Sequence, residues 1–447
     1  MTLTPEITTV LMLGGVFVAV LTGFPFALGI GTMGLLIGSL IFGFPSTLEL
    51  YYGRIFAQLT NYTLLAVPLF AFMGNMLERS GITENLFDAL YVWLGRLRGG
   101  LAIATILIGT ILAACVGVIA ASVTTLSLLA LSPMITRGYD KSLACGTVCA
   151  GGTLGILIPP SIMLVVYGPA AGVSVGKLFF GAFIPGFVLS LLYCGYIVIY
   201  CLVKKDAGPA VPASEVQDMP LSRKLSMLFV SLLPPVILIL AVLGSIFFGI
   251  AAPTEAAAVG AFAATALAVF YRKFSWDVLK GAAIDTIRLS GMVYLILAMA
   301  TAYVGVFLRA GCGGVVGNII LATPGGRWGA FAVIMVIAFF LGMFIDWIGI
   351  VLLFVPIVTP LAVQMGFDPI WFAMMICINL QMSFLTPPFA YAIFFLKGTA
   401  PPELGIETTD IIRGVIPFII LIMVCLIACI AFPQIILWLP EKMAALG

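Results

Sequence analysis

The sequence predicts an all-α polytopic membrane protein that contains an inverted repeat, two re-entrant hairpins and two helices broken at Pro-Pro pairs. Apolar residues make up 63% of the 447 positions and charged residues only 9%, whereas a soluble domain carries roughly 25% charged residues. Long charge-free runs separate the charged clusters, at 7–48, 99–136, 142–176 and 414–440. A hydrocarbon core about 30 Å thick needs ~20 apolar residues per helical span, so each run holds one or two passes.

Composition excludes several classes of function. The chain has no His, which removes Ser-His and Cys-His catalysis and any His-based proton path. Its nine Cys form no CxxC pair, and a net charge of +2 gives no sign of a nucleic-acid partner. An intramembrane aspartyl protease would need a second acid beside Asp346, and no other Asp lies inside a predicted span. We therefore expect a protein that is not an enzyme.

Ten full spans and two re-entrant hairpins account for the apolar segments. The spans are expected at 7–22, 24–44, 61–79, 142–166, 178–203, 226–250, 254–271, 290–308, 370–396 and 411–433. The hairpins are expected at 100–136 and 328–364, each turning near its middle. Two stretches, 46–60 and 273–289, mix charges with aromatic residues and are typical of amphipathic helices that lie along the membrane interface.

The distribution of basic residues predicts the orientation. With the N-terminus outside, 15 of the 20 Lys and Arg fall on the cytoplasmic side, as the positive-inside rule requires. The five that fall outside are Arg54, Lys177, Arg309, Arg327 and Lys442. Both termini are therefore expected on the outside of the membrane.

A repeat at an offset of about 228 residues organises the chain. Gly138-Tyr139-Asp140 recurs as Gly366-Phe367-Asp368, and Pro159-Pro160 recurs as Pro387-Pro388. In the predicted topology the first hairpin opens to the cytoplasm and the second to the outside, so the repeats are inverted. Inverted repeats with paired broken helices are typical of secondary transporters, whose sites lie near the membrane midplane.

These features divide the chain into six parts. They are N-terminal scaffold spans with an interfacial helix (1–60), a first repeat (61–203, with hairpin 100–136 and broken helix 142–166), a cytoplasmic linker (204–224), further scaffold spans with an interfacial helix (225–289), a second repeat (290–433, with hairpin 328–364 and broken helix 370–396) and a C-terminal tail (434–447).

The two Pro-Pro breaks are the first candidates for chemistry. Each Pro lacks an N–H and clashes with the preceding turn, so nearby carbonyls lose their helical partners. In hydrocarbon such carbonyls must be satisfied by protein, water or an ion, and a small gap lined by oxygens suits Na⁺. Ordinary proline kinks are the alternative, as expected for Pro234-Pro235 outside the repeat.

The hairpin turns are the second candidates. The first turn contains Val116 and Val118, and the second contains Asp346 in an apolar surround. A carboxylate inside the membrane is costly unless it is paired or bound to an ion, which makes Asp346 a functional candidate. Its alternative role is a structural cap for the second helix of the hairpin.

Four motifs resemble one family. These are the segments 152–161, 252–261, 343–346 and 384–388, and together they are similar to the large membrane (DctM-type) subunit of tripartite ATP-independent periplasmic (TRAP) transporters. The resemblance implies a bacterial inner membrane protein, so that the outside termini would lie in the periplasm. It also implies Na⁺-coupled rather than ATP-driven uptake of a small organic acid that a periplasmic binding protein (DctP-type) delivers. It also implies an elevator-type architecture, and a separate small four-helix subunit (DctQ-type) because the chain starts at the first large-subunit span.

The resemblance also implies two Na⁺ sites. The first would use carbonyls of Gly155, Ile158 and Pro159 with the facing turn at Val116 and Val118. The second would use Ser383, Thr386 and Pro387 near Asp346. Many relatives carry Ser in the first hairpin turn, where this chain has Cys115-Val-Gly-Val118, so ligation there is expected through the backbone. Generic polar candidates for the substrate pocket are Ser122, Ser161 and Asn379.

Two functions stay open at this point. The first is the large permease subunit of a Na⁺-coupled importer of small organic acids. The second is a stand-alone ion-coupled organic-anion symporter or exchanger without a binding protein. The absence of an Arg at either Pro-Pro break favours the first, because a stand-alone carboxylate transporter more often keeps its own anion-binding group.

Overall fold

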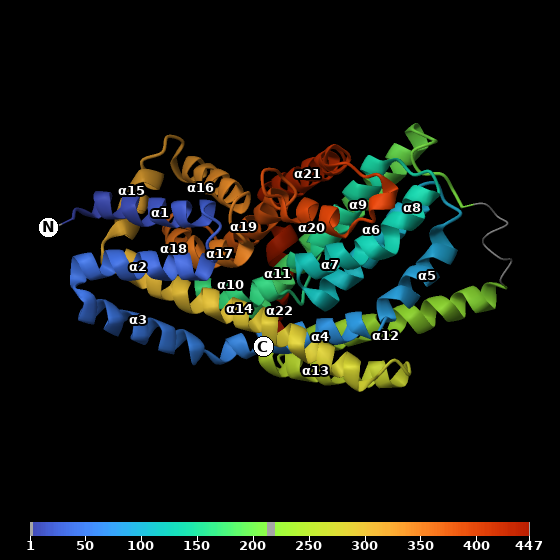
Figure 1. Ribbon diagram of the computed structural model, residues 1–447, viewed down its shortest axis with the longest axis horizontal. Helices are drawn as coiled ribbons and strands as arrows, with labels where there is room; N and C mark the ends of the chain where they lie inside the picture. Colours follow the sequence, from blue (N-terminus) through green and yellow to red (C-terminus); the bar gives the residue numbers. More distant parts are fainter. Residues whose placement is uncertain (1–2, 212–219, 447) are drawn as a thin grey trace.

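In the computed structural model, which describes residues 3–211 and 220–446, every regular element is a helix (Figure 1). Six of the described helices are long and apolar enough to cross a membrane, and eight if each of two bent pairs counts as one span. The all-helical membrane class is therefore confirmed. The spans expected at 7–22 and 24–44 correspond to helices of 17 residues, which fall short of this length.

Six helices form a long layer, which runs along the lower edge of Figure 1. They are α2 (Phe26–Phe42), α3 (Phe44–Leu59), α4 (Ala66–Arg79, preceded by the 3₁₀ turn Tyr62–Leu65), α12 (Leu221–Phe247), α13 (Pro253–Phe270) and α14 (Trp276–Arg309). Helix α14 packs against α2, α3 and α4, and α13 packs against α4 and α12. Arg79 pairs with Asp285 at 2.5 Å, and Asn75 donates to Thr286 at 3.1 Å, so polar contacts fasten α4 to α14.

Helix α14 corrects one expectation. An interfacial helix at 273–289 and a span at 290–308 were predicted as separate elements, but the structure joins them in one helix of 34 residues. Ser275 caps its N-terminus by accepting a bond from the Val278 N–H at 3.2 Å. No Pro lies within the helix, and a change from polar to apolar composition does not interrupt backbone hydrogen bonding.

The first hairpin and the first broken helix lie above this layer in Figure 1. They comprise α6 (Gly100–Val116), α7 (Ile119–Leu126), a π-helical turn (Ser127–Leu131), α8 (Ser132–Thr136), α9 (Lys141–Thr153), a 3₁₀ turn (Leu154–Ile156) and α10 (Ile162–Ala171). The chain reverses at Gly117, whose φ of +64° lies in the left-handed region that favours glycine. This turn falls where the sequence predicts it.

The second hairpin and the second broken helix have the same order of elements. They comprise α16 (Gly326–Gly342), α17 (Trp347–Leu353), α18 (Val355–Gln364), α19 (Pro369–Ser383) and α20 (Tyr391–Thr399). Helices α17 and α18 bend by 52° at their junction. Both Pro159-Pro160 and Pro387-Pro388 contain a cis peptide bond.

The remaining helices surround these two groups. They are α1 (Pro5–Leu21), α5 (Ile82–Leu94), α11 (Val175–Val203), α15 (Cys312–Leu321), the 3₁₀ turn Pro402–Leu404, α21 (Thr408–Ala431) and α22 (Gln434–Leu446). The sequence analysis did not predict the short helices α5 and α15. It also treated 434–447 as a tail, whereas α22 packs against α11 and buries Ile436 completely.

Local features recur at the spacing of the predicted repeat. Gly138 and Gly366 both have φ of +79°. The Asp two residues after each glycine precedes the broken helix and accepts backbone hydrogen bonds, Asp140 from Leu143 at 2.9 Å and Asp368 from Ile370 at 2.8 Å. An Asp in this position satisfies the free N–H groups of a first helical turn, so both broken helices begin in the same way.

The first part of the predicted linker 204–224 is docked onto the base of the first hairpin. Gly99 N–H donates to the Gly208 carbonyl at 2.9 Å, and Asp140 N–H donates to the Ala207 carbonyl at 3.0 Å. Val211 is buried, with 4% of its surface exposed. Residues 212–219 of the linker lie outside the described residues, and its last residues, from Leu221 on, already belong to α12.

Candidate functional site

The first Pro-Pro break leaves carbonyl oxygens without partners inside the protein. Helix α9 ends at the 3₁₀ turn Leu154–Ile156, and the next helix, α10, begins only at Ile162. Within the described part of the chain no hydrogen bond reaches the carbonyl oxygens of Ile158 or Pro159, and both residues are buried. Buried carbonyls are nearly always paired, so this pair can accept a cation or an ordered water.

The tip of the first hairpin closes over this break. A Cβ atom placed on Gly117 would lie 3.2 Å from the Ile162 nitrogen and 3.4 Å from the Pro160 carbonyl oxygen. A Cβ atom placed on Gly152 would lie 2.4 Å from Val123, which follows the tip on α7. The absence of side chains at these glycines allows the two backbones to approach each other.

Ser122 and Ser161 belong to the same group of residues. The Ser122 hydroxyl is buried, has no hydrogen-bond partner among the described residues, and lies 3.4 Å from the position of a Cβ on Gly155. The Ser161 hydroxyl donates to the Ile156 carbonyl at 2.8 Å. Ser161 therefore stabilises the broken segment, whereas the Ser122 oxygen is free to face a ligand.

The second break also contains two hydroxyl side chains. Ser383 donates to the Leu380 carbonyl at 2.8 Å, and Thr386 donates to the Met382 carbonyl at 2.9 Å. The tip of the second hairpin reaches this segment, because a Cβ on Gly342 would lie 2.1 Å from the Ser383 hydroxyl oxygen. Because both hydroxyl protons are donated to backbone carbonyls, the oxygen lone pairs stay available to accept a hydrogen bond or a cation.

The two breaks differ in exposure. Every residue from 151 to 168 is buried, including Pro159. In the second break Pro387 is exposed, and Phe389 has 53% of its surface exposed. Similar local structures therefore lie in different surroundings.

A cavity of about 490 Å³ lies between the layer and the two hairpin tips. Its lining comes from the end of α1, from the start of α2, from α14, from both tips and from α20. The lining residues are Val20, Phe24, Pro25, Phe26, Ala27, Val118, Ile119, Ala120, Leu289, Met292, Leu295, Ile296, Phe344, Ile345, Asp346, Trp347, Ile348, Tyr391 and Phe395. The first turns of α7 and α17 both face it, and helix N-termini favour anionic groups.

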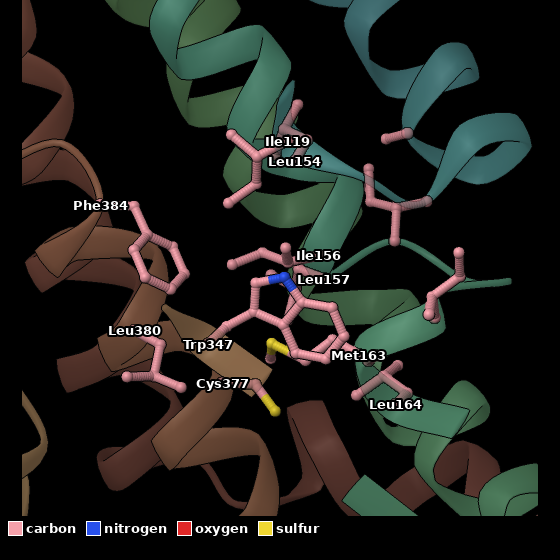
Figure 2. Close-up of a cluster of buried hydrophobic side chains, with 14 of the residues drawn as sticks. Ile119, Leu154, Ile156, Leu157, Met163, Leu164, Trp347, Cys377, Leu380 and Phe384 are labelled. Carbon is pink, nitrogen blue, oxygen red and sulfur yellow. The ribbon is translucent and has the colours of Figure 1, made fainter. Parts of the chain in front are cut away.

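Trp347 connects the second tip to the first break. Figure 2 shows its indole between Ile156 and Leu157 on one side and Cys377 and Leu380 of α19 on the other. Trp347 has 5% of its surface exposed. A displacement of the second tip therefore requires repacking around the first break.

The structure groups the predicted residues in three places. Val118, Gly155, Ile158, Pro159, Ser122 and Ser161 meet at the first tip and break. Ser383 contacts the second tip, and Thr386 and Pro387 follow it in the second break. Asp346 lines the cavity. Asn379 is outside these groups and donates to the Met335 carbonyl of α16 at 2.7 Å, and the Val116 side chain lies outside the described residues.

The sequence analysis missed the aromatic wall of the cavity. Tyr391 and Phe395 lie one turn apart on α20, and Phe24 and Phe26 lie at the start of α2. The aromatic cluster directly after the second Pro-Pro pair was a usable signal for Tyr391. No local sequence pattern predicts that Phe24 lines the same cavity as Tyr391, because the proximity of these two residues depends on tertiary packing.

The described residues contain no cluster of three or more Cys, Asp and Glu side chains placed to hold a metal ion. Any cation held at the first break would therefore rely mainly on backbone oxygens. This is suited to a weakly held monovalent ion, since tightly bound divalent ions are coordinated by several carboxylates.

Comparisons with known proteins agree with this architecture. Residues 13–435 match the family described as "Tripartite ATP-independent periplasmic transporter, DctM component". The chain is 31% identical over 389 residues to the C4-dicarboxylate TRAP transporter large permease protein DctM of Pseudomonas aeruginosa, covering 87% of this chain and 88% of that protein. It is 30% identical over 385 residues to the sialic acid TRAP transporter permease protein SiaT of Haemophilus influenzae, covering 86% of this chain and 61% of that protein.

A solved structure shares the fold. The YdaH transporter of Alcanivorax borkumensis superimposes with a TM-score of 0.61 over 88% of this chain and 90% of that one, at 15% sequence identity. The named relatives are transport permeases rather than enzymes. The resemblance that the four motifs indicated is confirmed, and the chain belongs to the DctM family of large permease components of tripartite ATP-independent periplasmic transporters.

Proposed function

We propose that this permease couples the uptake of a small organic acid to a Na⁺ gradient. The observation that carries the proposal is the pair of buried carbonyls at Ile158 and Pro159, which have no hydrogen-bond partner among the described residues and lie in the break that the first hairpin tip contacts. Sodium is a hard cation that prefers oxygen ligands, and unwound helices supply such oxygens in ion-coupled transporters. The unpartnered Ser122 hydroxyl near Gly155 adds a further oxygen.

A second Na⁺ site is proposed at the second break. Ser383 and Thr386 direct their protons to their own helix, which leaves lone pairs for a cation. Because Gly342 has no side chain, the second tip can lie against Ser383. Gly117 allows the same close approach between the first tip and the first break. On this proposal each hairpin closes one ion site.

The proposed orientation is an inverted repeat with both termini in the periplasm. Its support is the 15-to-5 distribution of basic residues and the features that recur at an offset of 228. We further propose that the hairpins and broken helices move as a unit against the layer, in an elevator-type cycle. The Thr125 hydroxyl of α7 donates to Glu78 of α4 at 2.6 Å, and this bond would break during that movement.

The family works with a small membrane subunit and a periplasmic binding protein. We propose that this chain does so as well, and that specificity lies partly in the binding protein. The N-terminus of α7 at the cavity would receive the carboxylate of the delivered solute, because the N-terminus of α17 already carries the acidic residue Asp346 as its N-cap.

Reconstitution tests the proposal. The cognate binding protein is first screened by thermal shift against C4-dicarboxylates and sialic acid, and the ligand it binds is used in uptake assays. Proteoliposomes with this chain, its small subunit and the loaded binding protein should accumulate that ligand with a Na⁺ gradient and fail to do so with K⁺. Uptake by this chain alone, or uptake independent of Na⁺, would overturn the proposal.

A further inference from the structure

A second, polar cavity lies away from the breaks and the hairpin tips. Its volume is about 430 Å³, and it opens between α5, the first part of α12 and the residue that follows α13. The lining residues are Asn85, Asp88, Arg223, Ser226, Met227, Val230, Ser231 and Tyr271. None of them lines the cavity between the tips, so a ligand held here would be distinct from the transported solute.

Two walls of this polar cavity carry opposite charges. Asp88 and Asn85 belong to α5, whereas Arg223 and Ser226 belong to α12, which packs against α5. Among the described residues, Asp88 and Arg223 form no ion pair with each other or with another side chain. Partial burial raises the pKa of the Asp88 carboxyl, and the neighbouring Glu84 raises it further. The acidic wall therefore lacks a positive partner, and the basic wall lacks a negative one.

The polar cavity lies where the membrane surface is expected. Helix α12 is long and apolar enough to cross a membrane, and the cavity is at its start. Phe229 and Leu233 are exposed on the stretch of α12 that follows. The Tyr271 hydroxyl at the end of α13 donates to the Val230 carbonyl of α12, and basic residues follow at 272–273. Tyr and basic residues are typical of the boundary between hydrocarbon and water.

A phospholipid headgroup that carries both charges fits these walls. A phosphate accepts hydrogen bonds from a guanidinium such as Arg223 and from a hydroxyl such as Ser226. A primary ammonium donates to a carboxylate such as Asp88 and to the amide oxygen of Asn85. A quaternary ammonium has no N–H to donate, and an uncharged glycerol group leaves Asp88 without a counter-charge. The walls therefore match a headgroup with one phosphate and one primary ammonium.

We propose that the polar cavity binds the headgroup of a phosphatidylethanolamine-type lipid, with its phosphate at Arg223 and its ammonium at Asp88. The acyl chains would lie along the exposed side chains of Phe229 and Leu233 on α12. Helix α12 belongs to the long layer, and α5 packs against α6 of the first hairpin. The lipid would therefore join the layer to the helix that precedes this hairpin. The inference does not depend on sodium coupling.

Native mass spectrometry tests the headgroup preference. The full chain with its small subunit is stripped of lipid in detergent. It is then titrated with phosphatidylethanolamine, phosphatidylcholine and phosphatidylglycerol that have identical acyl chains. The first phosphatidylethanolamine should bind about five-fold more tightly than either of the other lipids, the size expected for one charge-assisted hydrogen bond at a partly exposed site.

Substitutions on the two walls locate the effect. Asp88→Asn should remove most of the preference, because a neutral amide does not pair with the ammonium charge. Asp277→Asn is the matched control, since Asp277 is an exposed acid on α14 that does not line the cavity. Arg223→Gln should weaken the binding of all three lipids, because they share the phosphate. Arg98→Gln is its control, since Arg98 is exposed and lies outside the cavity.

The wild-type comparison needs no variant, so the proposal stays testable if a substitution prevents folding. Equal binding of the three lipids, or tighter binding of phosphatidylglycerol or phosphatidylcholine, would overturn it. A preference that Asp88→Asn leaves unchanged would also overturn it. Free phosphoethanolamine at the concentration of the lipid should not displace the bound lipid. Displacement would assign the polar cavity to a soluble zwitterion and overturn the assignment to a lipid.

Discussion

The Gln381 side-chain amide donates to the Thr153 hydroxyl at 3.4 Å, and the two residues are 228 positions apart, the offset of the predicted repeat. Equivalent positions of a two-fold repeat can touch only near the axis that relates them. Both side chains are fully buried, and the Gln381 carbonyl oxygen has no partner among the described residues. This contact joins α9 to α19, and each of the two residues precedes its Pro-Pro pair in the chain.

The Gln381–Thr153 contact predicts an asymmetric double-mutant cycle. Thr153→Val should lower the free energy of unfolding by about 1–3 kcal/mol, because it leaves the buried Gln381 amide without any partner. Gln381→Leu should cost less, since it also removes an unpaired oxygen. The double variant should then be more stable than Thr153→Val alone, as measured by thermal unfolding in detergent. Strictly additive effects would show that the two side chains do not interact.

The close approach of Gly342 to Ser383 predicts a steric effect. Gly342→Ala should destabilise the protein by about 1–3 kcal/mol, because a Cβ there overlaps a side chain that cannot move freely. Gly14→Ala is the matched control on another helix, where a Cβ would meet nothing within 4 Å. The control should be neutral or slightly stabilising, because Ala favours helix over Gly. Equal melting temperatures for the two variants would contradict the predicted packing.

Thr386 tests the second Na⁺ site. Thr386→Val keeps the shape and removes the hydroxyl, so the Na⁺ concentration for half-maximal uptake should rise several-fold if that oxygen binds the ion. Thr399→Val on α20 is the control, because Thr399 also donates to its own helix at 2.8 Å but lies beyond the break. An unchanged Na⁺ dependence in Thr386→Val would remove this side chain from the site.

The predicted orientation can be tested by Cys labelling. In a background without native Cys, Ser214→Cys should react with an impermeant maleimide only from the cytoplasmic side; position 214 lies outside the described residues. Ala322→Cys, in the exposed segment between α15 and α16, should react only from the periplasm. Labelling of both from the same side would contradict the inverted arrangement.

The sequence predicted features that depend on local chemistry. The turn at Gly117 and the two breaks follow from residues whose effect reaches only a few positions along the chain. The short helices α5 and α15 were not predicted, because ten to thirteen residues are too few to indicate a membrane span. The continuity of α14 was not predicted because its composition changes from polar to apolar along its length, although the helical backbone continues without a break.

The candidate site was predictable only in part. Residues at the breaks and tips were identified because Pro and Gly mark them, and Asp346 because an intramembrane acid is conspicuous. Phe24 and Tyr391 are 367 positions apart, and only the packing of α2 near both hairpin tips brings them to one cavity. For Asn379 the structure shows a structural contact that the sequence did not indicate, because its amide donates to the Met335 carbonyl and so holds two helices together.

The difference in exposure between the two breaks has a kinetic consequence. If both hold sodium as proposed, and the exposed surface at Pro387 faces water, the ion at Pro387 can exchange with the solution in this conformation, while the ion at Pro159 is enclosed. The two ions then arrive and leave in a fixed order, and the enclosed ion departs only after the first tip has lifted. Bound Na⁺ should then exchange in two phases of equal size. The fast phase would come from the ion at the second break and the slow phase from the enclosed ion at the first.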